Sequence, residues 1–389
     1  MPILIKRPDK TPLGIYVHVP FCRSKCQYCD FYSMATKDDK LIDGYLDAVC
    51  DHIKEAGELA PGYKVDSVYF GGGTPTFFGA DGMAVILTTI RRNFDVTADA
   101  EITFEANPDS VSDRLLHRLR AEGFNRVSLG IQSDDDEMLK KLGRPHTYAQ
   151  AVTAYQRIRK AGFRNISIDL MYGLPGQDLQ DWQETLDNVL RLNPEHISCY
   201  GLKVEEGTPL WEVKDFSNLA DDDTQADMYL AAVEALRSRG FRQYEISNFC
   251  RPGFPSRHNS SYWDGTPYLG CGAAAHSFDG TSRQWNVASI DGYIQGIRKG
   301  VPDTEREELD LATRYNDCIV TAMRTRRGIS LSRLRQEFGK ELADYCLKMA
   351  RQHLEQGTLE ISNDWLRLTE EGIFVSDGIM SDMMFVNEE

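Results

Sequence analysis

Three cysteines stand close together near the start of the chain and could bind a metal. Cys22, Cys26 and Cys29 lie in FCRSKCQYCDF, a C-x3-C-x2-C spacing whose Arg, Ser, Lys and Gln neighbours are unlike those of cysteines in core packing. A structural zinc ion and an electron-transfer iron–sulfur cluster each usually take four ligands, and the next cysteine, Cys50, lies in a helical pattern. Three thiolates without a fourth predict a [4Fe–4S] cluster with one open iron, which an amino and a carboxylate group could chelate.

Short β-rich runs alternate with longer amphipathic helical patterns over the first half of the chain. Strands are expected at 14–19, 67–70, 101–105, 126–132, 166–173 and 196–202. Helices are expected between them, at 41–56, 112–124, 148–163 and 181–192. This alternation predicts an α/β fold of βαβ units around a parallel sheet. Six such units favour a partial or full (β/α) barrel, where functional side chains gather at the carboxyl ends of the strands.

The cysteine spacing, placed directly after the first expected strand, resembles the radical S-adenosylmethionine superfamily. The resemblance implies a partial (β/α) barrel of radical-SAM type. It also implies that the open iron of the cluster binds the methionine end of S-adenosylmethionine. An electron from the reduced cluster then yields methionine and a 5′-deoxyadenosyl radical.

Further residues match this superfamily at the ends of the expected strands. Gly71-Gly72-Gly73-Thr74-Pro75 lacks the lysine of a P-loop and the third glycine of a dinucleotide fingerprint, so alone it indicates only a tight turn. A single charged residue at a strand end is often a helix cap or a surface ion pair. With the resemblance, a set of such residues around one rim is expected to contact S-adenosylmethionine: Tyr16, Gly72, Gly73, Thr74, Glu105, Gln132, Arg144 and Asp169.

The βα alternation stops near residue 244. The segment 245–290 is dense in Gly, Pro, Ser and aromatic residues without a helical period, which predicts loops. After about residue 305, helical runs precede LEISNDWLRL (359–368), expected as two strands around a Ser-Asn-Asp turn. We therefore expect three parts: a radical SAM core barrel over 1–243, a loop-rich linking segment over 244–300, and a small winged-helix-like C-terminal domain over 301–389.

The chain as a whole resembles the family of oxygen-independent coproporphyrinogen III dehydrogenase (HemN) and the related HemW-type heme chaperones. The resemblance covers nearly the full length and rests on GGGTPT, FEANP, GIQS, DLMYGLPGQ and GCGAAAHS. Dehydrogenases of this family have a further cysteine two residues after the third, where this chain has Phe31. They also have a longer leading segment, whereas 15 residues precede Tyr16 here. Residues 258–263, HNSSYW, match the HNxxYW motif of HemW proteins.

The HNSSYW motif supplies the expected heme contacts. Imidazole is a common axial ligand, which makes His258 the first candidate, and a tyrosine and a tryptophan suit a flat macrocycle. By themselves, a histidine in a loop is usually a hydrogen-bonded surface residue, and a Tyr–Trp pair is usually core. His276 and His18 are further candidate ligands. Three arginines could pair with the heme propionates: Arg251, Arg257 and Arg283. The scattered cysteines are expected to be structural: Cys199, Cys250, Cys271, Cys318 and Cys346.

Three classes of function follow. The resemblance favours a heme chaperone that binds heme, a [4Fe–4S] cluster and S-adenosylmethionine and delivers heme to membrane respiratory proteins. The alternative is a radical SAM dehydrogenase that oxidatively decarboxylates coproporphyrinogen III. Phe31 and the short leading segment predict no such turnover. A third class, a radical SAM enzyme acting on another substrate such as RNA, is disfavoured by the charge of the chain.

Composition limits the partners and the compartment. With 44 Lys and Arg against 59 Asp and Glu in 389 residues, the formal net charge is −15, which argues against nucleic-acid partners. No run approaches the roughly 18 apolar residues of a membrane span, and MPILIKRPDKTPLG lacks the apolar segment of a signal peptide. We therefore expect a cytoplasmic protein, and a homodimer is one possible assembly.

Overall fold

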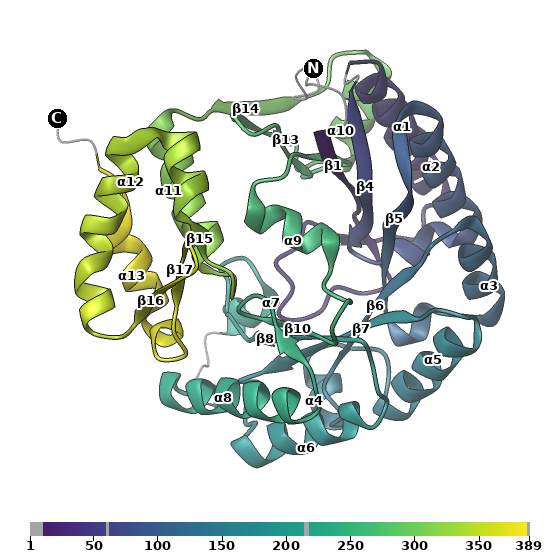
Figure 1. Ribbon diagram of the computed structural model, residues 1–389. Coiled ribbons are helices and arrows are strands. Elements are labelled where there is room, and N and C mark those ends of the chain that lie inside the picture. The colour runs from purple at the N-terminus through teal and green to yellow at the C-terminus, as the bar shows by residue number, and fades with distance from the viewer. Residues whose placement is uncertain (1–10, 60–61, 214–217, 387–389) are drawn as a thin grey trace.

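One large mixed sheet organises the protein. The computed structural model describes residues 11–59, 62–213 and 218–386. Its twelve-stranded sheet has the order β14-β13-β12-β11-β1-β4-β5-β6-β7-β8-β10-β9. The sheet curves, most helices cover its outer side, and the C-terminal residues form a separate lobe beside it (Figure 1). A mixed α/β fold with a large parallel sheet and a small C-terminal lobe agrees with the sequence-based expectation.

Six neighbouring parallel strands form the centre of the sheet. They are β1 (Thr11–Val19), β4 (Tyr63–Gly72), β5 (Asp95–Ala106), β6 (Arg126–Gln132), β7 (Asn165–Tyr172) and β8 (His196–Gly201). Each covers one of the six strands expected from the sequence. The helices that follow them are α1 (Asp39–Leu59), α2 (Gly79–Asn93), α3 (Asp113–Glu122), α4 (Asp136–Lys141), α5 (Tyr148–Lys160) and α6 (Leu179–Leu190).

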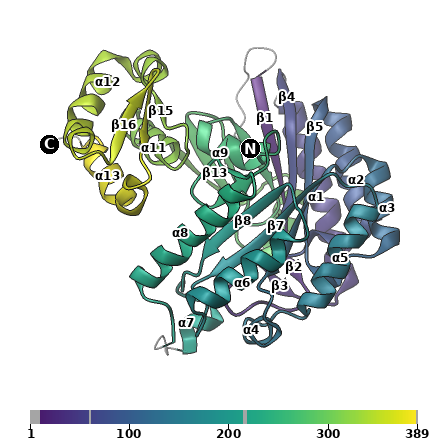
Figure 2. The same ribbon diagram turned by 60° about the horizontal axis from the view of Figure 1, so that its bottom comes forward.

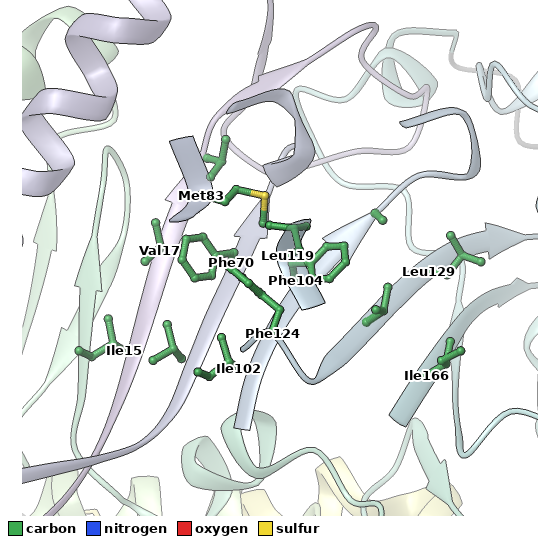
Figure 3. Close-up of a cluster of buried hydrophobic side chains, with 14 of the residues drawn as sticks. Ile15, Val17, Phe70, Met83, Ile102, Phe104, Leu119, Phe124, Leu129 and Ile166 are labelled. Carbon is green, nitrogen blue, oxygen red and sulfur yellow. The ribbon is translucent and has the colours of Figure 1, made fainter. Parts of the chain in front are cut away.

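Alternation along these strands separates an apolar face from a polar face, because successive side chains of a strand point to opposite sides. Buried residues such as Val17, Phe70 and Phe104 meet Met83 of α2 and Leu119 of α3 in the main core (Figure 3). The intervening residues are largely polar or aromatic: Tyr16, His18, Tyr69, Glu105, Ser128 and Asp169. The outer face therefore packs against the helices to form the main core, and the inner face presents polar side chains that could bind a ligand.

The segment expected to be loop-rich consists largely of regular structure, which corrects the expectation for residues 244–300. Its elements are β10 (Asn248–Cys250), α9 (Arg257–Asp264), β11 (Tyr268–Cys271), β12 (His276–Phe278), β13 (Ser282–Asn286) and α10 (Ile290–Arg298). Strand β10 pairs antiparallel with β8 and β11 pairs parallel with β1, so the segment extends the sheet on both sides of the six central strands. β9 (Arg242–Gln243) and β14 (Thr304–Glu308) are the edge strands.

Helix α9 lies on the concave side of the sheet (Figure 1). Two small residues on neighbouring strands make room for it. Gly14 and Ser67 are paired across β1 and β4, and a Cβ atom at Gly14 would lie 3.3 Å from the ring of His258. Ser256 caps the helix by accepting a hydrogen bond from the amide of Asn259.

The C-terminal lobe has its own core. It contains α11 (Leu311–Met323), α12 (Leu331–Glu355), α13 (Ser376–Met383) and a three-stranded sheet of β15 (Ile329–Ser330), β17 (Trp365–Leu368) and β16 (Leu359–Ser362), seen in Figure 2. The expected hairpin is confirmed, with Asn363 and Asp364 at φ 48° and 75° in the turn. The winged-helix assignment stays a prediction.

The buried hydrophobic residues form a main core, a core of the lobe and one small further cluster. The main core runs from Leu13 to Ile297, the core of the lobe runs from Tyr315 to Met383, and the small cluster lies between Met138 and Leu202. The domain limits that the sequence predicted at residues 243 and 300 stay predictions. Among the described residues, none of the helices has the length and apolarity needed to cross a membrane.

Candidate cluster and cofactor site

The three cysteines of the motif lie on one loop at the carboxyl end of β1. The short strands β2 (Phe21–Cys22) and β3 (Met34–Ala35) pair parallel and close this loop at its base. All three thiols are partly exposed, whereas Cys50 is buried in α1. Burial raises the pKa of Cys22 and of Cys29, so both are protonated thiols until a metal displaces the proton. The three cysteines of the motif therefore differ in exposure from Cys50, which the sequence analysis did not count as a ligand.

The glycine-rich turn after β4 forms a cradle against this loop. The amides of Gly73 and Thr74 donate to the carbonyl groups of Val19 and Phe21, each at 2.8 Å. A Cβ atom at Gly73 would lie 2.6 Å from the carbonyl oxygen of Phe21 and 3.0 Å from Sγ of Cys22. Only glycine therefore lets the turn approach the cysteine loop this closely.

The chemistry of the donor set fits an iron–sulfur cluster. Within the described part of the chain, no three His, Cys, Asp or Glu side chains are arranged to hold one metal ion. Thiolates are the usual ligands of iron–sulfur clusters, and three partly exposed cysteines lie on one short loop, so Cys22, Cys26 and Cys29 are the residues that would hold such a cluster.

A chain of hydrogen bonds ties the glycine-rich turn to the cysteine loop. Thr74 Oγ1 donates to Cys22 Sγ at 3.8 Å and accepts from Asn107 Nδ2 at 3.0 Å. Arg144 Nη2 donates to Asn107 Oδ1 at 2.8 Å and to the Gly130 carbonyl oxygen at 2.6 Å, while its Nη1 lies 3.6 Å from Cys26 Sγ. Arg144 is therefore held between β6 and the cysteine loop. This position agrees with its expected place among the residues around the rim.

Glu105 lies on the inner face below this network. Its Oε2 accepts from the Gly72 amide at 3.1 Å, and its Oε1 accepts from the Tyr69 hydroxyl at 2.8 Å. Burial and, to a lesser extent, the charge of Asp169 raise its pKa to about 7, and together they outweigh the lowering effect of both hydrogen bonds. A cation placed here, such as an ammonium group, would favour the ionised carboxylate.

Asp169 is the second buried carboxylate of the inner face. It accepts hydrogen bonds from Ser128 Oγ at 2.9 Å and from Ser167 Oγ at 3.2 Å. Burial raises its pKa despite these bonds. Two such acceptors on the inner face of one sheet are suited to hydroxyl or ammonium groups of a polar cofactor.

Gln132 and Tyr16 complete the expected set. Gln132 ends β6 with φ 72°, an uncommon backbone angle for a residue with a side chain. Its side-chain nitrogen Nε2 lies close to Gly130, where an added Cβ atom would meet it at 2.9 Å. The Tyr16 hydroxyl bonds His18 Nδ1 at 3.0 Å, and its ring stacks on Tyr69 with centroids 6.2 Å apart. Burial keeps the pKa of Tyr16 well above its ordinary value.

The structure brings the expected residues together around one rim, and their roles toward S-adenosylmethionine stay predictions. Sequence reasoning missed Asn107 and Tyr69, which connect them. Asn107 belongs to FEANP, two residues after Glu105, so its position in a recognised motif was an available signal. Tyr69 gave no such signal, because an aromatic residue in a strand ordinarily belongs to the hydrophobic core.

His258, the candidate heme ligand, lies on the inner face of the sheet over the amino-terminal half of β1, away from the cysteine loop. Its ring is 1% exposed, with Nδ1 3.1 Å from Ser67 Oγ and Nε2 2.9 Å from the Tyr262 hydroxyl. Its ring faces Gly14, and a strand rises about 3.3 Å per residue, so α9 meets β1 roughly 16 Å before the end of β1 at Val19. Burial and the charge of Arg126 lower the pKa of His258 to about 3. No ring atom faces solvent.

The other heme candidates are dispersed. His18 is buried, with its ring bonded to Tyr16 and to the Tyr32 carbonyl, whereas His276 is exposed on β12. Arg251 bonds Asn193, and Arg257 pairs with Asp99. Arg283 pairs with Asp317 of the lobe at 2.6 Å. The scattered cysteines are buried except for Cys318, which is partly exposed.

Comparisons with known proteins agree with this geometry. The Radical SAM superfamily pattern matches residues 16–189, and the HemN C-terminal domain matches residues 309–375. A protein of Bacillus subtilis named heme chaperone HemW is 34% identical, over 92% of this chain and 95% of its own length. The heme chaperone HemW of Escherichia coli is 38% identical over 70% of this chain and 71% of its own length.

A solved structure extends the similarity to the fold. The coproporphyrinogen III oxidase HemN of Escherichia coli, described as a radical SAM enzyme, superimposes with a TM-score of 0.85 at 25% identity. The match covers 96% of this chain and 90% of that protein. The cysteine loop, the rim and the near full-length relatives therefore agree: the chain belongs to the HemW family of the radical SAM superfamily.

Proposed function

We propose that this protein is a heme chaperone of HemW type, which binds heme, a [4Fe–4S] cluster and S-adenosylmethionine and delivers heme to a membrane respiratory protein. Its relatives over nearly the whole length are named heme chaperones, which supports this function. The proposed place of action is the cytoplasm.

The single observation that carries the proposal is the separation of the two ends of the barrel. The three cysteines lie beyond the carboxyl end of β1, whereas the HNSSYW helix crosses its amino-terminal half. The rings of Tyr16 and Tyr69 stack on each other and on His258, on the side of α9 that faces the rest of the sheet. A molecule bound outside α9 is thus shielded from a radical formed at the cysteine loop, which favours carriage of that molecule over its chemical conversion.

The cofactor end is proposed to be held by this chain's own residues. Cys22, Cys26 and Cys29 would bind the cluster, which supplies electrons when present. Glu105 and Asp169 would accept hydrogen bonds from ammonium and hydroxyl groups of S-adenosylmethionine, and the Gly72–Thr74 turn would bring backbone groups close to it. Phe31 is 64% exposed where the dehydrogenases have a further cysteine. That difference supports the chaperone over coproporphyrinogen dehydrogenation.

The test is heme binding followed by heme transfer. Protein reconstituted with iron and sulfide without oxygen is titrated with hemin, and the loaded protein is separated from free heme. It is then mixed with an immobilised apo-cytochrome b, and heme is followed by absorbance in both fractions. We expect one heme per chain and its appearance on the acceptor. Absence of saturable heme binding would refute the proposed function.

A further inference from the structure

A large cleft separates α9 and the neighbouring strands from the C-terminal lobe. Its volume is about 600 Å³, within the range of sites that hold compact organic ligands. Residues of α9, β11 and β12 form one side, and residues of α11, α12 and β17 form the other. Figures 1 and 2 show the lobe standing beside α9 and β13. The cleft is distinct from the cluster and cofactor site at the carboxyl end of β1.

Aromatic side chains line both sides of this cleft. Tyr262 and Trp263, the last two residues of the HNSSYW motif, lie on one side with Tyr268, and the Tyr262 and Tyr268 rings pack edge to face at 4.7 Å. Trp365 and Phe338 of the lobe line the other side. Flat apolar walls on two sides suit a planar, hydrophobic ligand.

The cleft also offers a cation for an acidic ligand. Arg327 is exposed, lies over the Trp365 ring at 4.1 Å, and has no ion pair with any residue that the structure describes. Arg283 and Arg314 also line the cleft, but they are paired with Asp317 and Glu337. An exposed guanidinium stacked on an aromatic wall is well placed for a carboxylate at the edge of a planar ligand.

We propose that heme binds in this cleft, with its macrocycle between Trp263 and Trp365 and a propionate on Arg327. The inference rests on the proposed function and assigns the site of that heme. The HNSSYW helix then contacts heme through Tyr262 and Trp263, its two aromatic residues that line the cleft. The C-terminal lobe supplies the opposite wall, so heme bridges the two cores of the protein.

His258 has a different place in this arrangement. It does not line the cleft, and its Nε2 is bonded to the Tyr262 hydroxyl at 2.9 Å. It therefore positions Tyr262 from behind and is not an axial ligand. The lining side chains that can ligate iron include the Cys318 thiol and the Tyr268 hydroxyl, whereas the Tyr262 hydroxyl is bonded to His258. Replacing His258 should consequently leave the position of the heme absorbance band unchanged.

Hemin titrations of matched variants test the site. Arg327→Gln should weaken heme binding about tenfold, the loss expected for one charge-assisted hydrogen bond. Arg335→Gln is its control, because Arg335 is an exposed arginine of the same lobe paired with Asp344 away from the cleft. Trp365→Leu should weaken binding and reduce the quenching of tryptophan fluorescence by heme, whereas Trp211→Leu, a partly exposed tryptophan of α7 (Pro209–Val213), should do neither.

The outcomes separate this inference from the proposed function. Wild-type protein that binds no heme contradicts the function itself. Wild-type binding with unchanged affinity in Arg327→Gln overturns the cleft while leaving the function in place. A displaced absorbance band in His258→Gln, with the melting temperature preserved, makes His258 the ligand and also overturns the cleft. Arg327 is a surface residue, so the heme affinity of Arg327→Gln can be measured even if Trp365→Leu fails to fold.

Discussion

At the scale of single residues, small side chains decide where the functional ones can lie. Gly14 and Ser67 leave the space that the His258 ring fills, and Gly73 lets the turn after β4 approach the cysteine loop. A one-carbon addition at such a position is therefore a sensitive probe of the site, although it changes neither charge nor polarity.

We predict that Gly73→Ala prevents normal cluster assembly. The added Cβ would lie 2.6 Å from the Phe21 carbonyl oxygen and 2.8 Å from that of Val19, so the cysteine loop must shift. Iron content after reconstitution should fall well below that of the wild type. Gly378→Ala in α13 is the control, since nothing lies within 4 Å of its added Cβ. Equal iron content in both variants would contradict the cradle.

Loss of any motif cysteine should abolish the cluster. Wild-type protein is expected to hold about four irons per chain. Cys22→Ala, Cys26→Ala or Cys29→Ala should hold almost none, because the loop supplies only three thiolates and the cluster needs all of them. Iron analysis and the cluster's visible absorbance give the measurement. Cys50→Ala should retain its iron, since Cys50 is buried in α1. An equal loss in this control would mean that Cys50 is a fourth ligand.

Glu105 should make the cofactor-free protein less stable as the pH rises. Burial raises its folded pKa to about 7 from an ordinary 4.5, so the folded state binds this proton more tightly than the unfolded state. Its contribution is complete below pH 4.5 and is lost as the pH rises through 7, by about 1–3 kcal/mol. Chemical denaturation at several pH values should show this slope in the wild type. The slope should be smaller in Glu105→Gln, and an identical slope would exclude Glu105 as its source.

At the scale of elements, α9 is tied to the sheet by a buried acid and base. Glu101 Oε1 accepts from the His258 amide at 3.2 Å, and its Oε2 lies 4.0 Å from Arg126 Nε. Arg126 is 1% exposed, and two of its nitrogen atoms find no hydrogen-bond partner among the described residues. The helix therefore depends on one carboxylate that also balances a buried cation.

Glu101→Ala should destabilise the protein by about 3–5 kcal/mol, because it leaves the Arg126 charge buried without a counterion. Denaturant unfolding of this variant should show the loss. Glu305→Ala, at an exposed acid of β14, should stay within about 0.5 kcal/mol of the wild type. If the two variants were equally stable, the Glu101–Arg126 pair would not hold α9 in place.

The sequence predicted the elements with strong periodicity and missed the short ones. All six central strands were found, because each is long enough to show a buried run between turn signals. Strand β11 has four residues, and its partner β1 lies some 250 positions earlier, so no local pattern could reveal the pairing. The polar residues of α9 hid its helical character, although Ser256 provided a capping signal.

The candidate site was predictable to a similar degree. Residues at the ends of parallel strands meet at one edge of the sheet, so Glu105 and Asp169 could be grouped from their motifs. Arg144 was expected at a strand end, but it follows α4 and reaches the rim through its hydrogen bonds to Asn107 and Gly130. The placement of His258 could not be foreseen. It depends on the gap over Gly14 and on a helix that the sequence pattern did not show.

At the scale of the whole molecule, the protein has two proposed sites joined by one curved sheet. The cysteine loop and its rim occupy the carboxyl end of the strands, and α9 with its cleft faces the C-terminal lobe. This separation explains how a radical SAM fold can serve a carrier. It predicts that heme uptake does not require the cluster.

The most direct test of this account is an anaerobic turnover assay. Reconstituted protein is incubated with coproporphyrinogen III, S-adenosylmethionine and a reductant, and the products are oxidised to porphyrins and separated by chromatography. The coproporphyrinogen III oxidase HemN of Escherichia coli serves as the positive control. The account predicts no protoporphyrin from this protein beside clear formation by the control, in preparations that bind hemin. Steady formation of protoporphyrinogen would contradict the chaperone and identify the protein as a dehydrogenase.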